Sequence, residues 1–374
     1  MFGRTFLKEA GKKWDQQILV FSEGRAYLYT FKPVIEELIR RHIAFRYITM
    51  DKNDPALQIK SRYMSSRYLG QGALAFWKFS MSKAKIMLST TPNIGTKGYP
   101  IIRPQRVECM AHIFHSISDV SFYRKGSLDF YDAVLMVGAF SLDSIRITEK
   151  LRALKTKECV SVGLPYFDVL ASLANHNRNW SERPVLLIAP SWGRKGFLAT
   201  YGNDFIIELA QSGFEIILRP HPQSLKSEKR VIENLEQRLK PYTHVHFDLD
   251  IDGSPSMSKS DVLISDSSSI RFDFAFIYER PVITLETPDE CMEMYERSDV
   301  GVKWEASLEK QLGPIFTLND KKELSQKLIA ALANIRNLKP QNIAVLRDRY
   351  IANFGHSSKA IVDWISNKLS SPPF

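Results

Sequence analysis

The chain has 374 residues, of which 44% are hydrophobic and 25% are charged, as is ordinary for a globular protein. Its formal net charge of +10 attracts phosphate-bearing partners such as nucleotides, nucleic acids or anionic lipids. Three cysteines do not form a disulfide framework, the first residues lack the apolar core of a secretory signal, and no apolar run is long enough for a membrane-spanning helix.

Short apolar runs alternate with helical stretches through the first half of the chain. We expect strands at residues 17–21, 45–49, 85–88, 107–114, 133–137 and 159–163. A helix is expected from Ser22 through Arg41, with apolar residues on one face. This alternation predicts a parallel sheet with helices on both faces.

The polar segment at residues 174–183 is the best candidate for a linker, and the alternation then resumes. Further strands are expected at residues 185–189, 215–218, 245–247, 262–265 and 282–285. We therefore predict an α/β protein of the GT-B arrangement, with two Rossmann-like parallel-sheet domains facing across a cleft. The expected domains are residues 1–175 and 184–350, followed by a C-terminal helix at 351–374 that can pack back on the first domain.

Residues 261–281 combine a strand, a polar turn and a helix start. The apolar run at 262–264 is followed by Ser265, Asp266, Ser267, Ser268 and Ser269, and then by partly helical apolar spacing around Asp273. Backbone N–H groups at a helix N-terminus, together with serine hydroxyls, make a ready anion site. Serine and aspartate are also preferred N-caps, but capping needs only one of them. The turn therefore favours a phosphate site.

A second polar segment, Arg219-Pro220-His221-Pro222, ends the strand expected at 215–218. Its two prolines stiffen the loop and exclude helix. Arginine suits bidentate contact with phosphate, and histidine can donate a hydrogen bond or a proton near neutral pH. Ligands of open α/β sheets bind at the carboxyl ends of strands. An ordinary proline-rich turn is the alternative, and pairing with the serine turn favours a binding site.

The segment from His112 to Asp119 contains a candidate general base. His115 is followed by two serines and Asp119, which can give it polar support. A buried core histidine is the alternative interpretation. His112 and His115 have a spacing compatible with a metal pair, but no nearby cysteines and histidines complete a ligand set, so we predict no metal site.

The loop Ser191-Trp192-Gly193-Arg194-Lys195-Gly196 follows the strand expected at 185–189. Two glycines and two cations at a strand end suit a nucleotide diphosphate, although the spacing of a P-loop is absent. We therefore count Ser191 and Gly193 among the candidate nucleotide ligands, with a basic surface loop as the alternative.

Residues 60–85 interleave cations, among them Arg62, Arg67 and Lys78, with aromatic side chains. This pattern suits an interfacial helix on an anionic membrane, and it suits single-stranded nucleic acid equally. The third interpretation is a helix packed on its own domain with a solvated basic face. Glycines near the middle of the stretch interrupt any long helix.

Together these motifs resemble the glycerophosphotransferase family of teichoic-acid and capsule synthesis, whose members use CDP-glycerol or CDP-ribitol. The family has an aromatic-His motif, then Arg-x-His-Pro, then Ser-Asp-x-Ser-Ser-x-x-x-Asp followed by Arg-Pro. The matching segments here are Phe114-His115, Arg219 to Pro222, Ser265 to Asp273 and Arg280-Pro281, and the tail Phe354 to Val362 is similar to the closing Gly-x-x-Ser segment. The first motif departs, because the family usually has Trp-His-Gly where this chain has Phe-His-Ser.

The resemblance implies a cytoplasmic transferase that is peripheral on the inner face of the cell membrane. It would move a polyol-phosphate group from a CDP-activated donor to a hydroxyl of a lipid-linked glycan at an anionic membrane surface, and release CMP. His115 would be the base, His221 would stabilise or protonate the leaving phosphate, and Arg219 would clamp charge. No cofactor is required, bridging Mg²⁺ is compatible with the scheme, and no nucleic acid partner is expected.

Two alternatives stay open, the first of them because Ser116 occupies the place of the family's usual glycine. One is a GT-B glycosyltransferase with a nucleotide-sugar donor, whose serine turn would again bind phosphate. The other is a non-catalytic module that binds nucleic acid or anionic glycan through the positive charge.

Overall fold

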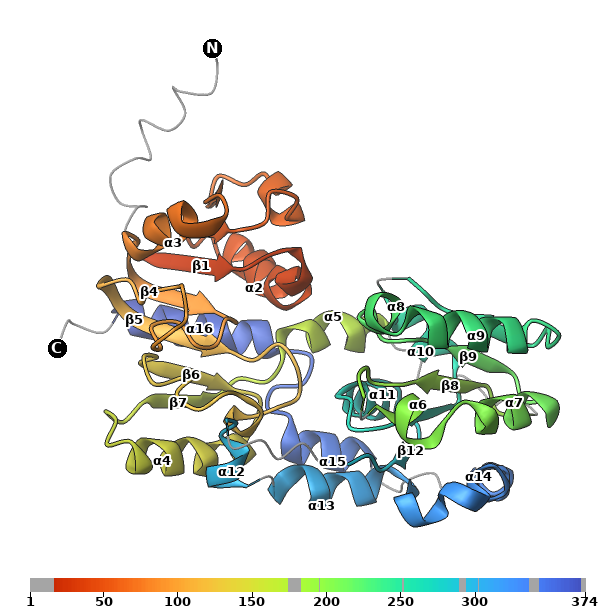
Figure 1. The fold of residues 1–374 in the computed structure, drawn as a ribbon. Helices are drawn as coiled ribbons and strands as arrows, with labels where there is room; N and C mark the ends of the chain where they lie inside the picture. The colour runs from red at the N-terminus through yellow and green to blue at the C-terminus, as the bar shows by residue number, and fades with distance from the viewer. Residues whose placement is uncertain are drawn as a thin grey trace. The chain divides into compact units, whose positions relative to one another are not determined.

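The structure is a computed structural model that describes residues 17–173, 183–194, 196–250, 252–288, 294–301, 303–335 and 343–370 (Figure 1). The chain divides into two compact units: one comprises Met1–Ser172, Cys291–Val302 and Asp348–Phe374, and the other Leu173–Glu290 and Lys303–Arg347. Of the linker expected at 174–183, only Arg183 lies within the described residues.

The first unit holds a parallel sheet of seven strands within the described residues, in the order β3-β2-β1-β4-β5-β6-β7. The strands are β1 (Ile18–Ser22), β2 (Phe45–Thr49), β3 (Met64–Tyr68), β4 (Lys83–Ser89), β5 (Arg106–Ile113), β6 (Ala133–Met136) and β7 (Glu158–Ser161). The helices are α2 (Leu28–Arg40), α3 (Gly72–Ser80), α4 (Leu142–Leu151), α5 (Pro165–Leu173), α12 (Arg297–Val300) and α16 (Ser357–Ser370).

Both faces of the first sheet are covered, as the unbroken apolar runs of its central strands require. Ile18 and Val20 of β1 belong to the core that α2 and α16 cover. Phe21 points to the other face, where its ring lies 4.4 Å from that of Phe79 in α3. The alternation along β1 therefore places a different helix layer on each face.

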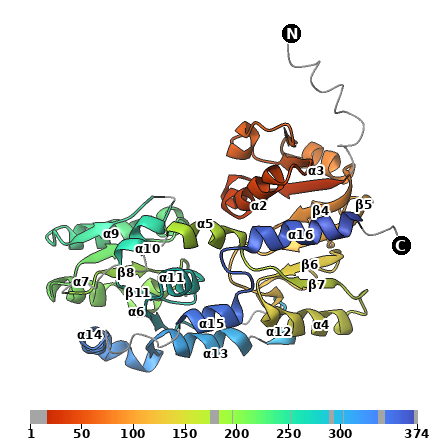
Figure 2. The same cartoon turned by 180° about the vertical axis from the view of Figure 1, so that it is seen from behind.

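The C-terminal helix α16 lies across the first sheet beside α2 (Figure 2). Its start is held by Asp168 of α5, whose carboxylate accepts hydrogen bonds from the backbone N–H groups of Ser357 at 2.8 Å and Ser358 at 2.7 Å. Just before α16, the chain passes so close to Gly163 that a Cβ there would lie 2.0 Å from the carbonyl oxygen of Ala352. The tail motif of the sequence thus has a structural role in this unit.

The second unit holds six parallel strands within the described residues, in the order β10-β9-β8-β11-β12-β13. They are β8 (Leu186–Ala189), β9 (Ile216–Leu218), β10 (Val245–Phe247), β11 (Val262–Ser265), β12 (Val282–Leu285) and β13 (Ile315–Phe316). The helices are α6 (Phe197–Tyr201), α7 (Asp204–Gln211), α8 (Ser224–Ser227), α9 (Lys229–Leu239), α10 (Ser254–Lys259), α11 (Ile270–Tyr278), α13 (Lys303–Leu312) and α14 (Leu324–Ala333). The division between the units falls within α15 (Ile343–Tyr350).

Three expectations need correction. The first helix begins at Leu28 rather than Ser22, after a 3-10 turn at Arg25–Tyr27. Residues 60–85, interpreted as a glycine-interrupted helix, contain the edge strand β3 ahead of the glycine-containing turn and α3. Residues 294–301, expected in the second domain, group with the first unit, where the buried carboxylate of Glu296 pairs with Arg152 at 2.8 Å.

Candidate functional site

Three of the candidate motifs meet at one edge of the second sheet. Strands β9, β8 and β11 are adjacent and parallel, so their carboxyl ends lie side by side. The loops that follow them contain His221, Ser191 and the serine turn, which we define as residues 265–269. This edge is where open α/β sheets bind ligands. The structure therefore brings together residues that are far apart in the sequence.

Asp266 joins two of these loops from behind. Its carboxylate is fully buried and accepts three hydrogen bonds, from the Ser191 hydroxyl at 2.6 Å, the Ser191 N–H at 3.1 Å and the Phe197 N–H at 2.9 Å. A carboxylate with three protein donors already holds the loop between β8 and α6 against the serine turn. We therefore expect Asp266 to position the site, whereas the sequence alone suggested a direct ligand.

The serine turn presents three hydroxyls that have no hydrogen-bond partner among the described residues. Ser265 is buried, and its hydroxyl donates to the carbonyl of Ala189 at 2.6 Å. Ser267 is exposed and the next two serines are half-buried; within the described residues, none of these three hydroxyls makes a hydrogen bond. Ser269 is the N-cap of α11, yet its side chain makes no capping bond. Helix capping therefore does not account for these hydroxyls.

Arg271 anchors the serine turn, a role that the sequence analysis missed. Its guanidinium is buried, with ion pairs to Glu305 at 2.9 Å and Glu309 at 2.5 Å on α13, and its Nε donates to the carbonyl of Ser268 at 3.0 Å. The backbone of the turn is thus fixed from α13. Asp273, in the first turn of α11, is half-buried. The only signal for Arg271 in the sequence is a cation inside an apolar helix.

Arg219 already has a carboxylate partner. Its guanidinium lies 2.6 Å from the carboxylate of Asp248 at the end of β10, and its side chain is 13% exposed. It packs directly over Gly253, where a Cβ would lie 2.8 Å from its Nε. Burial raises the pKa of Asp248, but hydrogen bonds from Ser256, Asp250 and Arg219 lower it overall. This geometry fixes the loop that carries His221.

His221 is held in one tautomer. The N–H of Gln223 donates to its Nδ1 at 3.0 Å, so the neutral ring carries its proton on Nε2. Burial lowers the pKa of His221, against the opposing charges of Glu228 and Asp266, so the ring is neutral at pH 7. The exposed ring of Trp192 lies 6.2 Å away, which places the loop after β8 beside it. His221 can therefore donate a hydrogen bond from Nε2 to a phosphate oxygen.

Gly193 supplies the bend in that loop. Its φ is +98°, a conformation that side chains rarely adopt, and no atom lies within 4 Å of the position that a Cβ would take. The loop therefore needs glycine here for its backbone conformation, and not because neighbouring atoms exclude a side chain. Ser191, by contrast, is committed to Asp266 through both its N–H and its hydroxyl.

His115 lies at the carboxyl end of β5 in the first unit. Its ring makes an edge contact with Tyr27 at 5.3 Å, and its carbonyl accepts a hydrogen bond from the Tyr29 hydroxyl at 3.0 Å. Its Nδ1 is buried and has no hydrogen-bond partner within the described residues. Burial lowers the pKa of His115, so the neutral ring can accept a proton at pH 7.

His112 is a core histidine. It is fully buried, its Nε2 lies 2.9 Å from the Tyr123 hydroxyl, and burial lowers its pKa to about 3. Within the described residues, no group of three or more His, Cys, Asp or Glu is arranged to hold a metal ion.

Polar groups near His115 were missed by the sequence analysis. Glu23 follows β1 and accepts a hydrogen bond from the Tyr99 hydroxyl at 2.8 Å. After β4, the buried hydroxyls of Thr90 and Thr91 have no hydrogen-bond partner within the described residues. Strands β1, β4 and β5 are neighbours, so these groups share the carboxyl edge with His115. The polar run Ser-Thr-Thr-Pro after an apolar strand was the available signal.

The three cations assigned to acceptor or membrane contact have different surroundings. Arg62 is exposed and donates to the Tyr63 hydroxyl at 2.6 Å. Arg67 lies on the edge strand β3, and Lys78 of α3 donates to the carbonyl of Leu69 at 3.0 Å. Arg67 and Lys78 line a common cavity. None of the helices in the described residues is long and apolar enough to cross a membrane.

Comparison with known proteins identifies both a family and a fold. A family model described as CDP-Glycerol:Poly(glycerophosphate) glycerophosphotransferase matches residues 124–367, a range that begins after the Phe114-His115 motif. No curated protein matches the sequence significantly.

Among solved structures, the wall teichoic acid polymerase TagF is 17% identical over 95% of this chain and 89% of its own, with a TM-score of 0.59. A putative UDP-N-acetylglucosamine 2-epimerase from Listeria monocytogenes is 12% identical over 96% of this chain and 98% of its own, with a TM-score of 0.61. The UDP-GlcNAc 2-epimerase from Neisseria meningitidis is 14% identical over 94% of this chain and 100% of its own, with a TM-score of 0.60. These identities show the fold alone, and it is the GT-B fold with two Rossmann-like domains that the sequence predicts.

Proposed function

The chain belongs to the CDP-glycerol:poly(glycerophosphate) glycerophosphotransferase family, and from this premise we propose that it transfers a polyol-phosphate group from a CDP-activated donor to an acceptor hydroxyl. The observation that carries the proposal is the serine turn, whose three outer hydroxyls have no partner within the described residues and stand at the start of α11. Hydroxyls and helix N–H groups in this arrangement suit the diphosphate of such a donor. A variant of TagF was soaked with CDPG, which supports the same class of donor.

In the proposed reaction the acceptor oxygen attacks the distal phosphorus of the donor diphosphate. A new P–O bond forms to the acceptor, the bond from that phosphorus to the bridging oxygen breaks, and CMP leaves with the bond's electron pair. His115, neutral because burial lowers its pKa, takes the proton of the acceptor hydroxyl. The Nε2–H of His221 donates to a phosphate oxygen as charge develops on the leaving group.

The remaining site residues hold these groups in place. Ser267, Ser268 and Ser269 contact the diphosphate, while Asp266 and Arg271 keep the turn in position from behind. Arg219, with its charge balanced by Asp248, contributes mainly by fixing the loop of His221. Phosphoryl transfer needs little beyond positioning and charge stabilisation, so the scheme requires no metal and accommodates a bridging Mg²⁺ on the donor.

We further propose that the acceptor is a lipid-linked glycan or polymer and that the protein works peripherally on the inner face of the cell membrane. The formal charge of +10 supports attraction to an anionic membrane surface. The cations of residues 60–85 are the candidate contact, and we expect no nucleic acid partner.

The experiment that tests the proposal is a donor panel. The protein is incubated with CDP-glycerol, CDP-ribitol, UDP-N-acetylglucosamine and other nucleotide sugars, with a membrane fraction as acceptor source, and donor consumption is measured. The proposal expects consumption of a CDP-polyol only. Consumption of a nucleotide sugar instead would support the glycosyltransferase alternative, to which Ser116 still points.

A further inference from the structure

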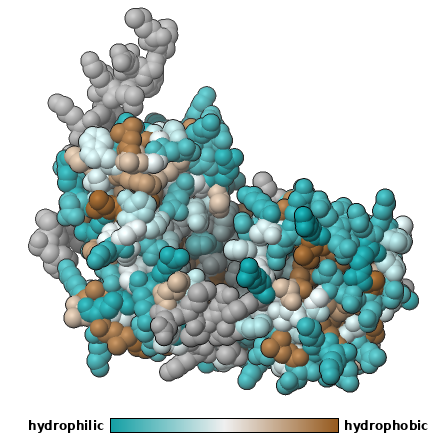
Figure 3. Space-filling model, viewed as in Figure 1, coloured by the Kyte–Doolittle hydropathy of each residue, from teal (hydrophilic) through white to brown (hydrophobic). Residues whose placement is uncertain are grey.

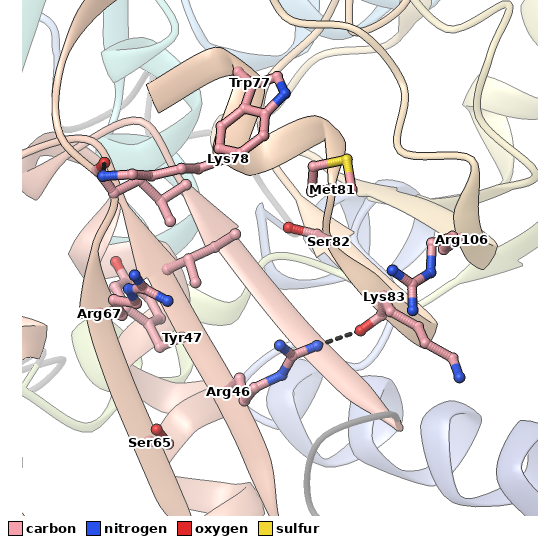
Figure 4. A pocket seen from close by; sticks show the side chains of 12 residues that line it. Arg46, Tyr47, Ser65, Arg67, Trp77, Lys78, Met81, Ser82, Lys83 and Arg106 are labelled. Carbon is pink, nitrogen blue, oxygen red and sulfur yellow. Dashed lines mark hydrogen bonds between the residues drawn. The ribbon is translucent and has the colours of Figure 1, made fainter. Parts of the chain in front are cut away.

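A cavity of about 490 Å³ opens beside α3 in the first unit (Figure 4). We name it the basic pocket, after the five cations that line it: Arg46, Arg67, Lys78, Lys83 and Arg106. Arg46, Lys83 and Arg106 lie at or near the amino ends of β2, β4 and β5, and Arg67 lies on the edge strand β3, whereas His115 follows the carboxyl end of β5. The pocket is therefore separate from the candidate catalytic edge.

The charge of the basic pocket is not balanced by the residues that line it. None of its twelve lining residues is acidic. Arg67, Lys83 and Arg106 form no ion pair within the described residues. Elsewhere in the same unit, Arg40 and Arg41 share the carboxylate of Glu37. Concentrated cations without carboxylates create a local positive potential that attracts a multiply charged anion.

Two of the five cations donate hydrogen bonds to backbone carbonyls. The Arg46 guanidinium donates to the carbonyl of Lys83, and Figure 4 shows it between Arg67 on one side and Arg106 on the other. The Lys78 ammonium donates to the carbonyl of Leu69. These contacts hold two of the cations in fixed positions at the pocket. The pocket is thus partly organised before anything binds.

The rim of the basic pocket is apolar and exposed. Trp77 and Met81, which line the pocket, are 60% and 52% exposed, and Leu74 one turn earlier on α3 is 59% exposed. Their spacing puts them on one side of the helix. Figure 3 shows apolar side chains gathered on the surface of the first unit around α3, among polar ones. Exposed apolar side chains would not contribute to the binding of a soluble phosphate.

We propose that the basic pocket binds the phosphate group of an anionic phospholipid, while Leu74, Trp77 and Met81 enter the boundary between head groups and acyl chains. Tryptophan beside cations is the composition of a membrane interface. The cations of the pocket favour an anionic head group, and the apolar rim favours a lipid over a free phosphate. The inference rests on the proposed function only in that a lipid-linked acceptor requires the protein at a membrane.

Vesicle cosedimentation of the full chain, without donor or acceptor, tests this inference. One variant combines Arg67→Gln, Lys83→Gln and Arg106→Gln; its matched control combines Lys226→Gln, Arg230→Gln and Lys240→Gln, three exposed cations of the second unit. Each cation near an anionic surface is worth about fivefold in binding. The pocket variant should therefore lose roughly a hundredfold in affinity for phosphatidylglycerol vesicles, and the control less than about threefold.

Three further arms identify the source of the phosphate. Vesicles given the same surface charge by oleate carry carboxylates, and the wild type should bind them more weakly than phosphatidylglycerol. Trp77→Ser with Leu74→Ser keeps every cation and should still lose at least tenfold in vesicle binding. Inorganic pyrophosphate and a single-stranded oligonucleotide, titrated without vesicles, should bind weakly.

Equal loss in the pocket variant and its control, or no loss in either, would overturn the proposal. So would tight binding of pyrophosphate, which would make the pocket a free-phosphate site, or an oligonucleotide that binds more tightly than the vesicles. Donor consumption is not measured here, so failure of this inference leaves the proposed transfer reaction standing, and failure of the donor panel leaves vesicle binding interpretable.

Discussion

Replacing Asp266 with Asn should weaken the fold and donor binding together. The buried carboxylate accepts three hydrogen bonds that tie Ser191 and Phe197 to the serine turn. An asparagine of the same shape keeps one oxygen but loses the charge and presents an N–H₂ group to protein donors. A hydrogen bond to a charged group is worth about 1.5–3 kcal/mol, against about 0.5–1.5 for a neutral one, so three bonds lose on the order of 3 kcal/mol.

Part of that loss should appear in binding. The loop between β8 and α6 would have to be ordered by the donor, and a cost of about 1.4 kcal/mol corresponds to a tenfold rise in the Kd. Urea unfolding gives the free energy of unfolding of the variant, and isothermal titration calorimetry gives its Kd for CMP and CDP-glycerol. We expect both quantities to change.

Asp261→Asn is the matched control. Asp261 is also buried and accepts a hydrogen bond from the Val185 N–H at 2.9 Å, but it precedes β11 whereas Asp266 follows it. This variant should lose stability with an unchanged Kd. The reasoning fails if Asp266→Asn leaves the Kd unchanged, or if both variants weaken donor binding equally.

His221→Asn should reduce turnover by roughly a hundred- to a thousand-fold in a CMP-release assay, while circular dichroism shows an intact fold. Ser267→Ala with Ser268→Ala should weaken donor binding by about 1.5–3 kcal/mol per hydroxyl in calorimetry without loss of stability, because these hydroxyls have no partner within the described residues. The rate should fall on acidification, at a pH below the usual range of histidine titration, because burial lowers the pKa of His115. Burial moves the pKa of His112 from 6.5 to about 3, so the free energy of unfolding should fall by up to about 5 kcal/mol between those pH values, and His112→Gln should flatten the curve.

Each of these expectations has a contrary result. Near-normal turnover in folded His221→Asn would remove this residue from the reaction, and reduced stability of the double serine variant would make its hydroxyls structural. An acid limb that is unchanged in His115→Gln would assign the titration to another group. A pH profile of unfolding that is the same in wild type and His112→Gln would place the acid sensitivity elsewhere.

Most strands could be predicted because their chemistry is local. Residues 262–265 and 282–285 are mainly apolar runs bounded by polar residues, residues 45–49 alternate apolar Phe45 and Tyr47 with Arg46, and the structure has strands at all three positions. The edge strand β3 was missed because its exposed side chains are polar, so Ser65 and Arg67 resemble the solvated face of a helix. The two-residue strand β13 is too short to give a pattern.

The support of the site could not be predicted because it depends on distant residues. From the sequence alone, Asp266 can be a ligand, a helix cap or a residue that joins two loops. The contact with Ser191, 75 residues earlier, shows that it joins two loops. Arg271 pairs with the carboxylates of Glu305 and Glu309, which lie 34 and 38 residues later in the chain, on another helix. The sequence therefore located the motifs that meet at the edge of the second sheet, while tertiary structure decides which side chains face the ligand.

The measurement that tests the central claim most directly is ³¹P NMR of the protein with CDP-glycerol and a membrane acceptor. Transfer of glycerol phosphate predicts that both diphosphate resonances disappear together and are replaced by one phosphomonoester, CMP, and one phosphodiester. Removal of His221 should abolish both product signals. A nucleoside diphosphate as product would mean that a carbon–oxygen bond was broken and the group moved without its phosphate, and it would contradict the account.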